Sequence, residues 1–318
     1  MKNFEYARAR SVDGAIQLST SESRFLSGGI DLLGEMKEYI VSPQRVIDLK
    51  TIPNLDRIDT STETWKFGAN VRIAEIASND QIRATLPGLA EAAAEVGSPQ
   101  IRNVATLGGN LAQHSRCWYY RQRDLRCLKR GGSTCYALEG ENKYHSLFSG
   151  NPCISPVVSN LAVILAALDG RVIVRRGEQE VTFAIPDLYS VAWNNPLAHN
   201  SLRPADLIVR VEVSTVKNRS TYMQVSEKGD FDWALVSCAA AGQKTGSQWT
   251  QVAVFLGAVA PIPYAVDSPL LERSGLTSDS IASIAESLAS KATPLTHNGY
   301  KLPIAQALVR RCLDRITT

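Results

Sequence analysis

Phe25-Leu26-Ser27-Gly28-Gly29-Ile30-Asp31-Leu32-Leu33 is the stretch that bears most directly on the fold of this 318-residue chain. A short apolar run at 24–27 precedes the glycine pair, and residues 30–39 have a helical pattern. Two glycines between a strand and a helix allow a positive φ and a close backbone approach, so several N–H groups can face one anion. The stretch matches neither the G-x-G-x-x-G dinucleotide fingerprint nor a P-loop, so a nucleotide bound here requires a different fold.

A second glycine pair lies within residues 100–111, in the turn Thr106-Leu107-Gly108-Gly109-Asn110. Thr106 and Asn110 carry short polar side chains that can hydrogen-bond to a phosphate or a ribitol chain. Two glycine turns that are far apart in sequence can hold one pyrophosphate from both sides and share its charge among backbone N–H donors. The alternative is two unrelated tight turns, and spacing alone does not decide between them.

Four of the six cysteines follow the second turn in the pattern C-x9-C-x7-C-x17-C. They are Cys117, Cys127, Cys135 and Cys153. The C-x2-C pairs of zinc ribbons and bacterial ferredoxins are missing, so the spacing does not identify a metal. Cationic neighbours lower thiol pKa values and offset the negative charge of a cysteine-ligated cluster. These neighbours are Arg116, Arg126, Lys129 and Arg130. A metal ion or cluster is therefore favoured over a disulfide pair or inert thiols.

Other residues near these cysteines have simpler interpretations. His114 and His145 flank the cysteines, and we interpret both as hydrogen-bonding residues rather than ligands. The aromatic run Trp118-Tyr119-Tyr120 is interpreted as a shield for a cluster. Cys238 lies in an apolar run and Cys312 in a predicted helix, so both are expected to be buried, small apolar side chains.

The bulk composition is that of an ordinary globular protein, with 44% hydrophobic residues, 20% charged residues and a formal net charge of +3. This weak charge argues against nucleic acid as the main partner. The chain contains no apolar run as long as a membrane span, and its first residues do not read as a signal peptide. We therefore expect a cytoplasmic protein, unless a signal on a partner subunit carries a folded complex elsewhere.

The length exceeds the size at which one core usually grows, so two or three domains are expected. We predict a first segment at 1–54, a second at 55–192 with a cysteine insertion at about 113–155, and a last domain at 193–318. The Asn- and Pro-rich stretch 193–204 is the predicted linker into the last domain.

Hydrophobic periodicity predicts elements in all three parts. The predicted strands are 24–27, 46–49, 65–69, 171–174, 207–213, 222–225, 235–241 and 252–259. The predicted helices are 30–39, 73–77, 87–96, 160–168, 278–290 and 303–313. Strands followed by helices after the linker indicate an α+β domain.

At this point the sequence resembles a known family. The stretch 27–33 resembles the flavin motif A-G-G-T-D-L-L, and Ala105-Thr106-Leu107-Gly108-Gly109-Asn110-Leu111-Ala112 resembles the second motif of the same family. These motifs are those of the FAD-binding medium subunits of the xanthine oxidase family of molybdenum hydroxylases. The resemblance implies an α+β chain with a PCMH-type (vanillyl-alcohol-oxidase-like), two-part FAD-binding domain. The stretches 231–237 and 256–260 resemble the C-terminal domain shared with carbon monoxide dehydrogenase flavoproteins.

A smaller group within this family carries an inserted loop with a 4Fe–4S cluster. It includes the β subunit of 4-hydroxybenzoyl-CoA reductase and the flavin subunit of bacterial periplasmic aldehyde oxidoreductase. Arg116-Cys117 followed by aromatic residues is similar to that insertion, and its early C-x9-C spacing looks closer to the aldehyde oxidoreductase type. The resemblance implies that Cys117, Cys127, Cys135 and Cys153 are the four ligands.

The resemblance also implies a set of FAD contacts. Those in the two motifs are Arg24, Phe25, Leu26, Ser27, Gly28, Gly29, Ile30, Asp31, Leu32, Leu33, Thr106, Gly109 and Asn110. Asn160 stands where the family often has an Asp near the ribitol or the pyrophosphate. Ile185 corresponds to an apolar residue that covers the flavin, and Lys228 to a basic position near the isoalloxazine ring.

The implied function is that of an electron-transfer subunit in a heterotrimer. Substrate would be oxidised at a molybdenum cofactor on a large subunit, and electrons would pass through 2Fe–2S clusters on a small subunit to this FAD. NAD⁺, ferredoxin, quinone or O₂ would be the external acceptor. No catalytic acid or base for the substrate is expected in this chain. The alternatives are a zinc-stabilised scaffold on a flavin fold and a stand-alone flavin oxidase, for which no substrate base is evident.

Overall fold

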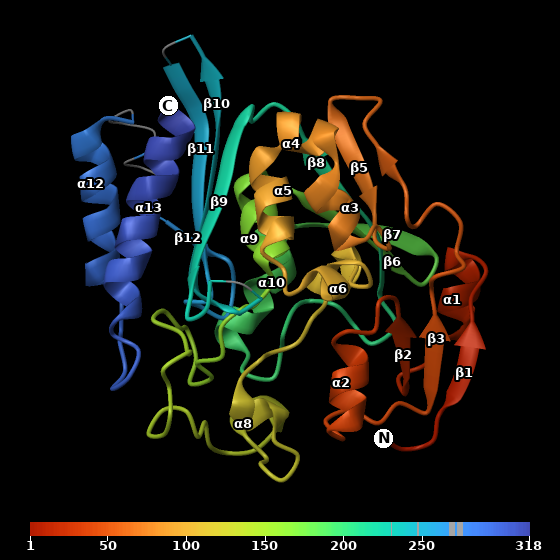
Figure 1. Ribbon diagram of the computed structural model, residues 1–318. Helices are drawn as coiled ribbons and strands as arrows, with labels where there is room; N and C mark the ends of the chain where they lie inside the picture. The colour runs from red at the N-terminus through yellow and green to blue at the C-terminus, as the bar shows by residue number, and fades with distance from the viewer. Residues whose placement is uncertain (230, 247, 267–270, 272–275) are drawn as a thin grey trace.

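The computed structural model describes residues 1–318 with the exception of 230, 247, 267–270 and 272–275. The described residues form three sheets with helices beside and between them (Figure 1). Helices and strands are mixed in all parts of the chain, which is the predicted α+β class.

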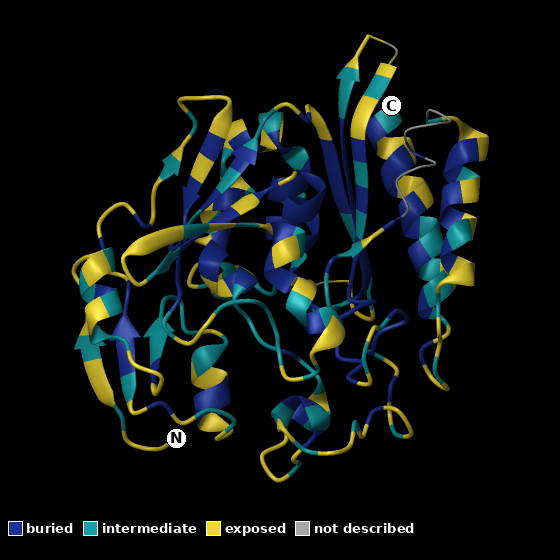
Figure 2. Ribbon diagram, turned by 180° about the vertical axis from the view of Figure 1, so that it is seen from behind, coloured by how far each residue is buried: buried dark blue, intermediate teal, exposed yellow. Residues whose placement is uncertain are grey.

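The first sheet is small and parallel, and it carries the first glycine turn. Its strand order is β1 (Glu5–Arg8), β3 (Arg45–Asp48), β2 (Ser23–Leu26). α1 (Val12–Leu18) connects β1 to β2, and α2 (Leu32–Lys37) follows the glycine turn. The middle strand, β3, is the most buried, as Figure 2 shows. β2, α2 and β3 confirm predicted elements. β1 and α1 lie where no element is predicted, because β1 is mostly exposed and lacks hydrophobic alternation.

The second sheet is antiparallel and has the strand order β4-β5-β8-β6-β7. The strands are β4 (Ile58–Asp59), β5 (Thr64–Gly68), β8 (Leu207–Ser214), β6 (Arg171–Arg176) and β7 (Gln179–Ala184). β6 and β7 form a hairpin in which Gly177 has a φ of +59°, as the glycine at this position predicts.

The position of β8 corrects one prediction. We expect residues 207–213 to open the last domain, but β8 pairs with β5 on one side and with β6 on the other. Hydrophobic alternation identifies a strand without identifying its partners, so the sequence could not place β8 in a particular sheet. We therefore propose that the last domain begins after Ser214 rather than at residue 193.

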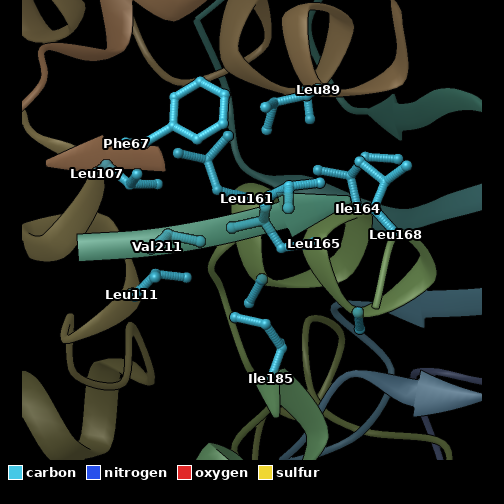
Figure 3. Packing of buried hydrophobic residues seen from close by; sticks show 14 of the residues in the cluster. Phe67, Leu89, Leu107, Leu111, Leu161, Ile164, Leu165, Leu168, Ile185 and Val211 are labelled. Atoms are coloured by element: carbon cyan, nitrogen blue, oxygen red, sulfur yellow. The ribbon is translucent and has the colours of Figure 1, made fainter. Parts of the chain in front are cut away.

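Helices surround a single core beside the second sheet. They are α3 (Ile73–Ser78), α4 (Asp80–Thr85), α5 (Pro87–Ala94), α6 (Pro99–Arg102), α7 (Leu107–Leu111), α9 (Asn160–Ala167) and α10 (Ile185–Asn194). α9 is apolar and buried over almost its whole length, and Figure 3 shows its leucines among Phe67, Leu89 and Val211. Leu107 and Leu111 belong to the same core, so hydrophobic burial fixes α7 and with it the second glycine turn.

The last sheet is antiparallel and has its own core. Its order is β12-β11-β10-β9, with β9 (Arg219–Ser226), β10 (Ala234–Thr245), β11 (Gln248–Gly257) and β12 (Tyr264–Ala265). α12 (Ser278–Ser287), η2 (Leu288–Ser290) and α13 (Lys301–Thr317) lie on one side, and α5 and α9 contact the sheet from the other (Figure 1). The three longer strands and both helices correspond to predicted elements.

The insertion between α7 and α9 has little regular structure. Residues 112–159, all of them described, contain only α8 (Trp118–Arg121) and η1 (Leu128–Arg130). The insertion lies at the edge of the molecule on the same side as α2 (Figure 1). Its order must come from polar contacts and from the cysteines, because few of its residues enter a hydrophobic core.

Candidate functional site

Both glycine turns line one large cavity, which we call the motif cavity. Its volume is about 450 Å³. Of the predicted FAD contacts, the lining includes Arg24, Phe25, Leu26, Ser27, Gly28, Gly29, Ile30, Asp31, Leu32, Thr106, Gly109, Asn110 and Asn160. Other parts of the wall come from the residues between α5 and α6, the start of the insertion, the segment before β8, and the turn between β9 and β10, which contributes Phe231, Asp232 and Trp233. Residues far apart in sequence therefore meet at one site.

The two turns are in direct contact, and this contact explains the glycine at position 28. A Cβ atom there would lie 2.2 Å from the carbonyl oxygen of Val104, so a larger residue would force the turns apart. Gly29 has a φ of +75°, which few other residues adopt. Ser27 Oγ lies 2.9 Å from Thr106 Oγ1, a hydrogen bond that joins the first turn to the second.

Asn70 is a further cavity residue that the sequence did not reveal. Its Oδ1 accepts a hydrogen bond of 2.6 Å from Ser27 Oγ, and its Nδ2 donates to the carbonyl of Leu49 at 2.9 Å. The side chain is buried and fixes the first turn to the end of β3. A lone Asn after a strand carries no motif, so only its three-dimensional neighbours identify it.

The second turn is held by its own short polar side chains. Thr106 caps α7 and accepts a hydrogen bond from the N–H of Gly109 at 3.3 Å. The N–H of Gly108 donates to the carbonyl of Ala69 at 2.8 Å, and a Cβ at position 108 would lie 2.9 Å from the Cβ of Ala69. Asn110 Oδ1 accepts a hydrogen bond from Ser159 at 2.6 Å. The backbone of this turn is therefore rigid before any ligand binds.

Three predicted contacts do not line the motif cavity as the structure describes it. Leu33 points out of α2 and is half-exposed. Ile185 is fully buried in the core beside the second sheet, where α10 packs, and its contact with the flavin stays a prediction. Lys228 lies on the exposed turn between β9 and β10, where its backbone N–H donates to Asp232 Oδ2 at 3.3 Å. Asp232 does line the cavity.

Asn160 lies on the cavity wall, but its amide is already bound. Its Nδ2 donates to the hydroxyl of Tyr222 at 2.9 Å and to Oε1 of Gln224 at 2.8 Å. Both partners come from β9, so Asn160 joins the start of α9 to the last sheet. Asn160 can therefore contact a ligand through its side-chain oxygen, as a hydrogen-bond acceptor.

Asp31 joins the first glycine turn to the insertion. Its Oδ1 accepts hydrogen bonds from Arg116 and, at 2.7 Å, from Arg121 Nη2, while its Oδ2 accepts one from the backbone N–H of His114 at 2.7 Å. Burial opposes ionisation of this carboxyl, but the two guanidinium groups outweigh it and lower the pKa of Asp31. The carboxylate therefore stays charged and paired.

A second buried carboxylate extends this connection. Glu35 Oε1 lies 3.1 Å from His114 Nδ1 and accepts a hydrogen bond from the hydroxyl of Tyr120 at 3.0 Å. Burial and the neighbouring Glu35 raise the pKa of Tyr120, so its hydroxyl remains a donor. Asp31, Glu35 and His114 are close enough to hold a metal ion, but Arg116 and Arg121 already supply the positive charge there. We interpret the group as an ion-pair network.

The four predicted cysteines come together around a second, small cavity, which we call the cysteine cavity. Its volume is about 10 Å³. Its lining comprises Cys117, Tyr119, Tyr120, Cys127, Leu128, Lys129, Cys135, Tyr136, Ala137, His145, Cys153 and Ser155. Four cysteines from separate positions of the insertion thus line one cavity.

The surroundings of these thiols suit a metal cluster. Burial raises the pKa of the Cys117 thiol to about 12 and also raises that of Cys153. A buried thiol of this kind loses its proton when a metal ion takes the proton's place. Cys117 precedes the first turn of α8, and the backbone N–H groups of Tyr119 and Tyr120 partly offset the effect of burial on its pKa.

His145 contacts the cysteine cavity in its neutral form. Its Nε2 lies 3.1 Å from Cys117 Sγ. Burial lowers the pKa of His145 to about 4, so the ring carries no charge at neutral pH. Its Nδ1 is buried without a hydrogen-bond partner among the described residues. The sequence interpretation of His145 as a hydrogen-bonding residue agrees with this contact.

Two residues of the last domain hold the insertion by hydrogen bonds. Lys301, at the start of α13, is fully buried and donates hydrogen bonds to the carbonyls of Tyr144 (2.9 Å), His145 (3.0 Å) and Ala258 (2.8 Å). Asn298 Nδ2 donates to the carbonyl of Ser146 at 2.9 Å. This role could not be predicted from the sequence, because a lysine at a helix start is usually exposed to solvent.

The remaining cysteines lie away from both cavities. Cys238 and Cys312 are fully buried in the core of the last domain, where Cys312 Sγ donates to the carbonyl of Cys238 at 3.5 Å. The prediction that both are small apolar core residues is confirmed.

The segment before β8 touches both cavities. The Lys129 ammonium group donates to the carbonyl of Ala198 at 2.8 Å, and the ring of His199 stacks on that of His114 at 4.1 Å. The N–H of Ser115 donates to His199 Nδ1 at 3.3 Å. Asn200 and the residues after it line the motif cavity. The segment predicted as a linker therefore lines the motif cavity and contacts Lys129, which lines the cysteine cavity.

Comparison with known proteins identifies the class. The model of the FAD-binding domain in molybdopterin dehydrogenase matches residues 2–214, a range that ends with β8. The chain belongs to the family of FAD-binding subunits of molybdenum hydroxylases. It is similar to the aldehyde oxidoreductase FAD-binding subunit PaoB of Escherichia coli strain K12, with 31% identity over 96% of both chains.

Two further similarities extend over almost the whole chain. The glyceraldehyde dehydrogenase medium chain of Sulfolobus acidocaldarius is 21% identical over 98% of both chains. A chain of the reconstituted CO dehydrogenase from Oligotropha carboxidovorans superimposes with a TM-score of 0.77 at 20% identity, over 99% of this chain and 98% of the other. This structural likeness confirms the fold of the CO dehydrogenase flavoproteins that the resemblance implied.

The chain is thus an FAD-containing oxidoreductase subunit of the molybdenum hydroxylase type. Within the part of the chain that the structure describes, no helix combines the length and the apolar character that a membrane crossing requires.

Proposed function

We propose that this chain is the electron-transfer subunit of a heterotrimeric molybdenum hydroxylase and that it carries both FAD and a 4Fe–4S cluster. Partner subunits would hold the molybdenum cofactor and the 2Fe–2S clusters. NAD⁺, ferredoxin, quinone or O₂ would accept the electrons. The chain would work in the cytoplasm, or in the periplasm if a partner carries the export signal.

The motif cavity would hold FAD, which supplies one- and two-electron chemistry when bound. Both family motifs line the cavity and touch each other through Gly28 and Val104, so a pyrophosphate can contact both turns. Thr106, Gly109, Asn110 and the residues from Arg24 to Leu32 would make the contacts. We propose weaker or indirect roles in FAD binding for four further residues, which are Leu33, Asn160, Ile185 and Lys228.

Cys117, Cys127, Cys135 and Cys153 would hold the cluster. Support comes from the position of all four cysteines in the lining of one cavity and from the buried Lys129 beside them. Tyr119 and Tyr120 line the cysteine cavity, and Trp118 packs edge-on against Tyr119 and Tyr144, which supports the proposal that these rings shield a cluster from water.

The observation that carries the proposal is the adjacency of the two cavities. Arg116 lines the motif cavity, and the next residue, Cys117, lines the cysteine cavity. Neighbouring cavities suit electron exchange between FAD and a cluster, whereas a purely structural metal would not need to lie beside the flavin. We therefore favour a redox role for the cluster.

The substrate class that we propose for the complex is aldehydes. PaoB and the glyceraldehyde dehydrogenase medium chain, two relatives matched over nearly the full length, both carry names of aldehyde-oxidising enzymes. The substrate would bind on the partner subunit, so the isolated chain should show no hydroxylase activity, and turnover by it would overturn this assignment.

The test is anaerobic purification followed by a visible spectrum and by assays of iron, acid-labile sulfide, zinc and flavin per chain. We expect one FAD with about four irons and four sulfides. The Cys127→Ser variant should contain less iron and sulfide than the wild type. The control variant Cys238→Ala, which changes a cysteine in the core of the last domain, should keep both. If the purified chain contains FAD but no iron, it is a medium subunit without a cluster. If it contains zinc but no flavin, the zinc-stabilised scaffold is favoured.

A further inference from the structure

Lys129 is the residue in the cysteine cavity that neither the motifs nor the ion-pair network explains. It lies in η1, two positions after Cys127, and only 9% of its surface is exposed. Its neighbour Arg130 has an ordinary structural role and donates to the carbonyls of Gln122, Arg123 and Leu125. Lys129 instead points inward, which is unusual for a lysine.

Lys129 lines the cysteine cavity together with all four cysteines. Among the described residues, Ala198 provides its one hydrogen-bond acceptor, at 2.8 Å. Of the described cavity-lining residues, Lys129 is the only lysine or arginine. The carbonyl of Ala198, in the segment before β8, thus holds the ammonium group of Lys129 beside the cavity that the four cysteines line.

Burying an ammonium group is unfavourable unless negative charge compensates for it. Protonated thiols provide little compensation, whereas the thiolates of a cysteine-ligated cluster provide a great deal. The cluster becomes more negative still when it gains one electron, so a nearby fixed cation stabilises the reduced form more than the oxidised form.

We propose that Lys129 is the charge-compensating residue of the cysteine cavity, and that its ammonium group raises the reduction potential of the iron–sulfur cluster held there. The inference rests on the proposed function. The electron would come from reduced flavin in the motif cavity, and no proton needs to accompany it because Lys129 already balances the added charge.

The test is an EPR-monitored redox titration of the anaerobically purified chain and its variants, with dithionite as reductant. Lys129→Met keeps the length of the side chain and removes its charge, so the cluster should be reduced only at a lower potential. Iron, sulfide and FAD content should remain those of the wild type. Lys129→Arg should keep a potential near the wild-type value. Lys143→Met, on the exposed part of the insertion where Lys143 pairs with Glu227, should change nothing.

The outcomes separate the inference from the proposed function. A Lys129→Met variant with full iron content and an unchanged potential would overturn the inference alone. If Lys129→Met loses its iron, a Lys129→Arg variant that keeps iron and potential supports the charge role, and iron loss in both would overturn it. A wild-type chain that binds zinc in place of iron and sulfide would overturn the proposed function and this inference with it.

Discussion

Arg116 and Cys117 are consecutive residues that line different cavities, the first facing the motif cavity and the second the cysteine cavity. The side chain of Arg116 also pairs with Asp31 of the first glycine turn and lies 4.9 Å from the ring of Trp233 in the last domain. One residue thus connects the flavin motif, the insertion and the last domain, and changes at this junction should affect both sites.

Asp31→Asn should weaken this junction. The substitution leaves Arg116 and Arg121 partly buried without their shared carboxylate, and breaking a buried pair from one side costs about 3 kcal/mol. We expect a lower free energy of unfolding in urea and lower retention of FAD and iron together. Asp80→Asn removes a carboxylate that is 96% exposed and should change stability by less than about 0.5 kcal/mol. Equal losses in both variants would contradict a special role for Asp31.

Gly28→Ala should separate the two turns. The new Cβ would meet the carbonyl of Val104 at 2.2 Å, and neither backbone can move without disturbing the other turn. Overpacking of this kind costs about 1–3 kcal/mol, and the purified chain should contain less FAD. Gly34→Ala is the matched control, because that glycine lies in α2 with no atom within 4 Å of the added methyl. Full flavin content in Gly28→Ala would show that the turns tolerate separation.

His199 should make stability depend on pH in the acidic range. Burial and then His114 lower the pKa of His199 well below 6.5, so the folded chain keeps the ring neutral while the unfolded chain binds a proton. Because the unfolded state binds more protons below about pH 6.5, the free energy of unfolding should fall as the pH falls. His199→Phe keeps the stacking on His114 and should show a shallower decline in Tm between pH 7 and pH 5. If Tm falls equally steeply with pH in the wild type and in His199→Phe, the pH dependence does not come from His199.

Trp233→Ala should loosen the flavin with little effect on folding. Trp233 is half-exposed and holds Arg116 by a cation–π contact of about 0.5–1 kcal/mol, so the Kd for FAD should rise roughly two- to fivefold. Trp118→Ala removes an indole of similar exposure that does not line the motif cavity among the described residues, and it should leave the flavin Kd unchanged. Fluorescence titration of the deflavinated chain measures both.

Much of the fold could be predicted because its long elements have clear hydrophobic periods. α9, α13, β10 and β11 are examples, and their predicted positions agree with the structure to within a few residues. β1 was missed because an edge strand with exposed side chains has no such period. β8 was predicted as a strand and assigned to the wrong sheet, because pairing depends on contacts that a single sequence does not encode locally.

The candidate site could also be predicted only in part. Glycine turns and cysteines have unusual chemistry, so their positions could be predicted from the sequence. In the structure the two glycine turns line one cavity, and the four cysteines line another. Asn70, Glu35, His199 and Lys301 have common residue types, and their roles depend on partners far away in sequence. Ile185 was predicted from its family position, and the structure shows it as a buried core residue outside the cavity lining, so its contact with FAD stays a prediction.

The contacts of Lys301 constrain the order in which the molecule can be built. The loop that carries His145 is fixed by a side chain about 150 residues further along the chain, at the start of α13. A nascent chain folds its earlier parts first, so the FAD-binding part can form while Lys301 is still inside the ribosome. All four cysteines have then already left the ribosome, yet the contacts of Lys301 with the loop of His145 are not yet made. We therefore expect the cluster of the proposed function to be loaded after translation, onto a chain that has already acquired its overall shape.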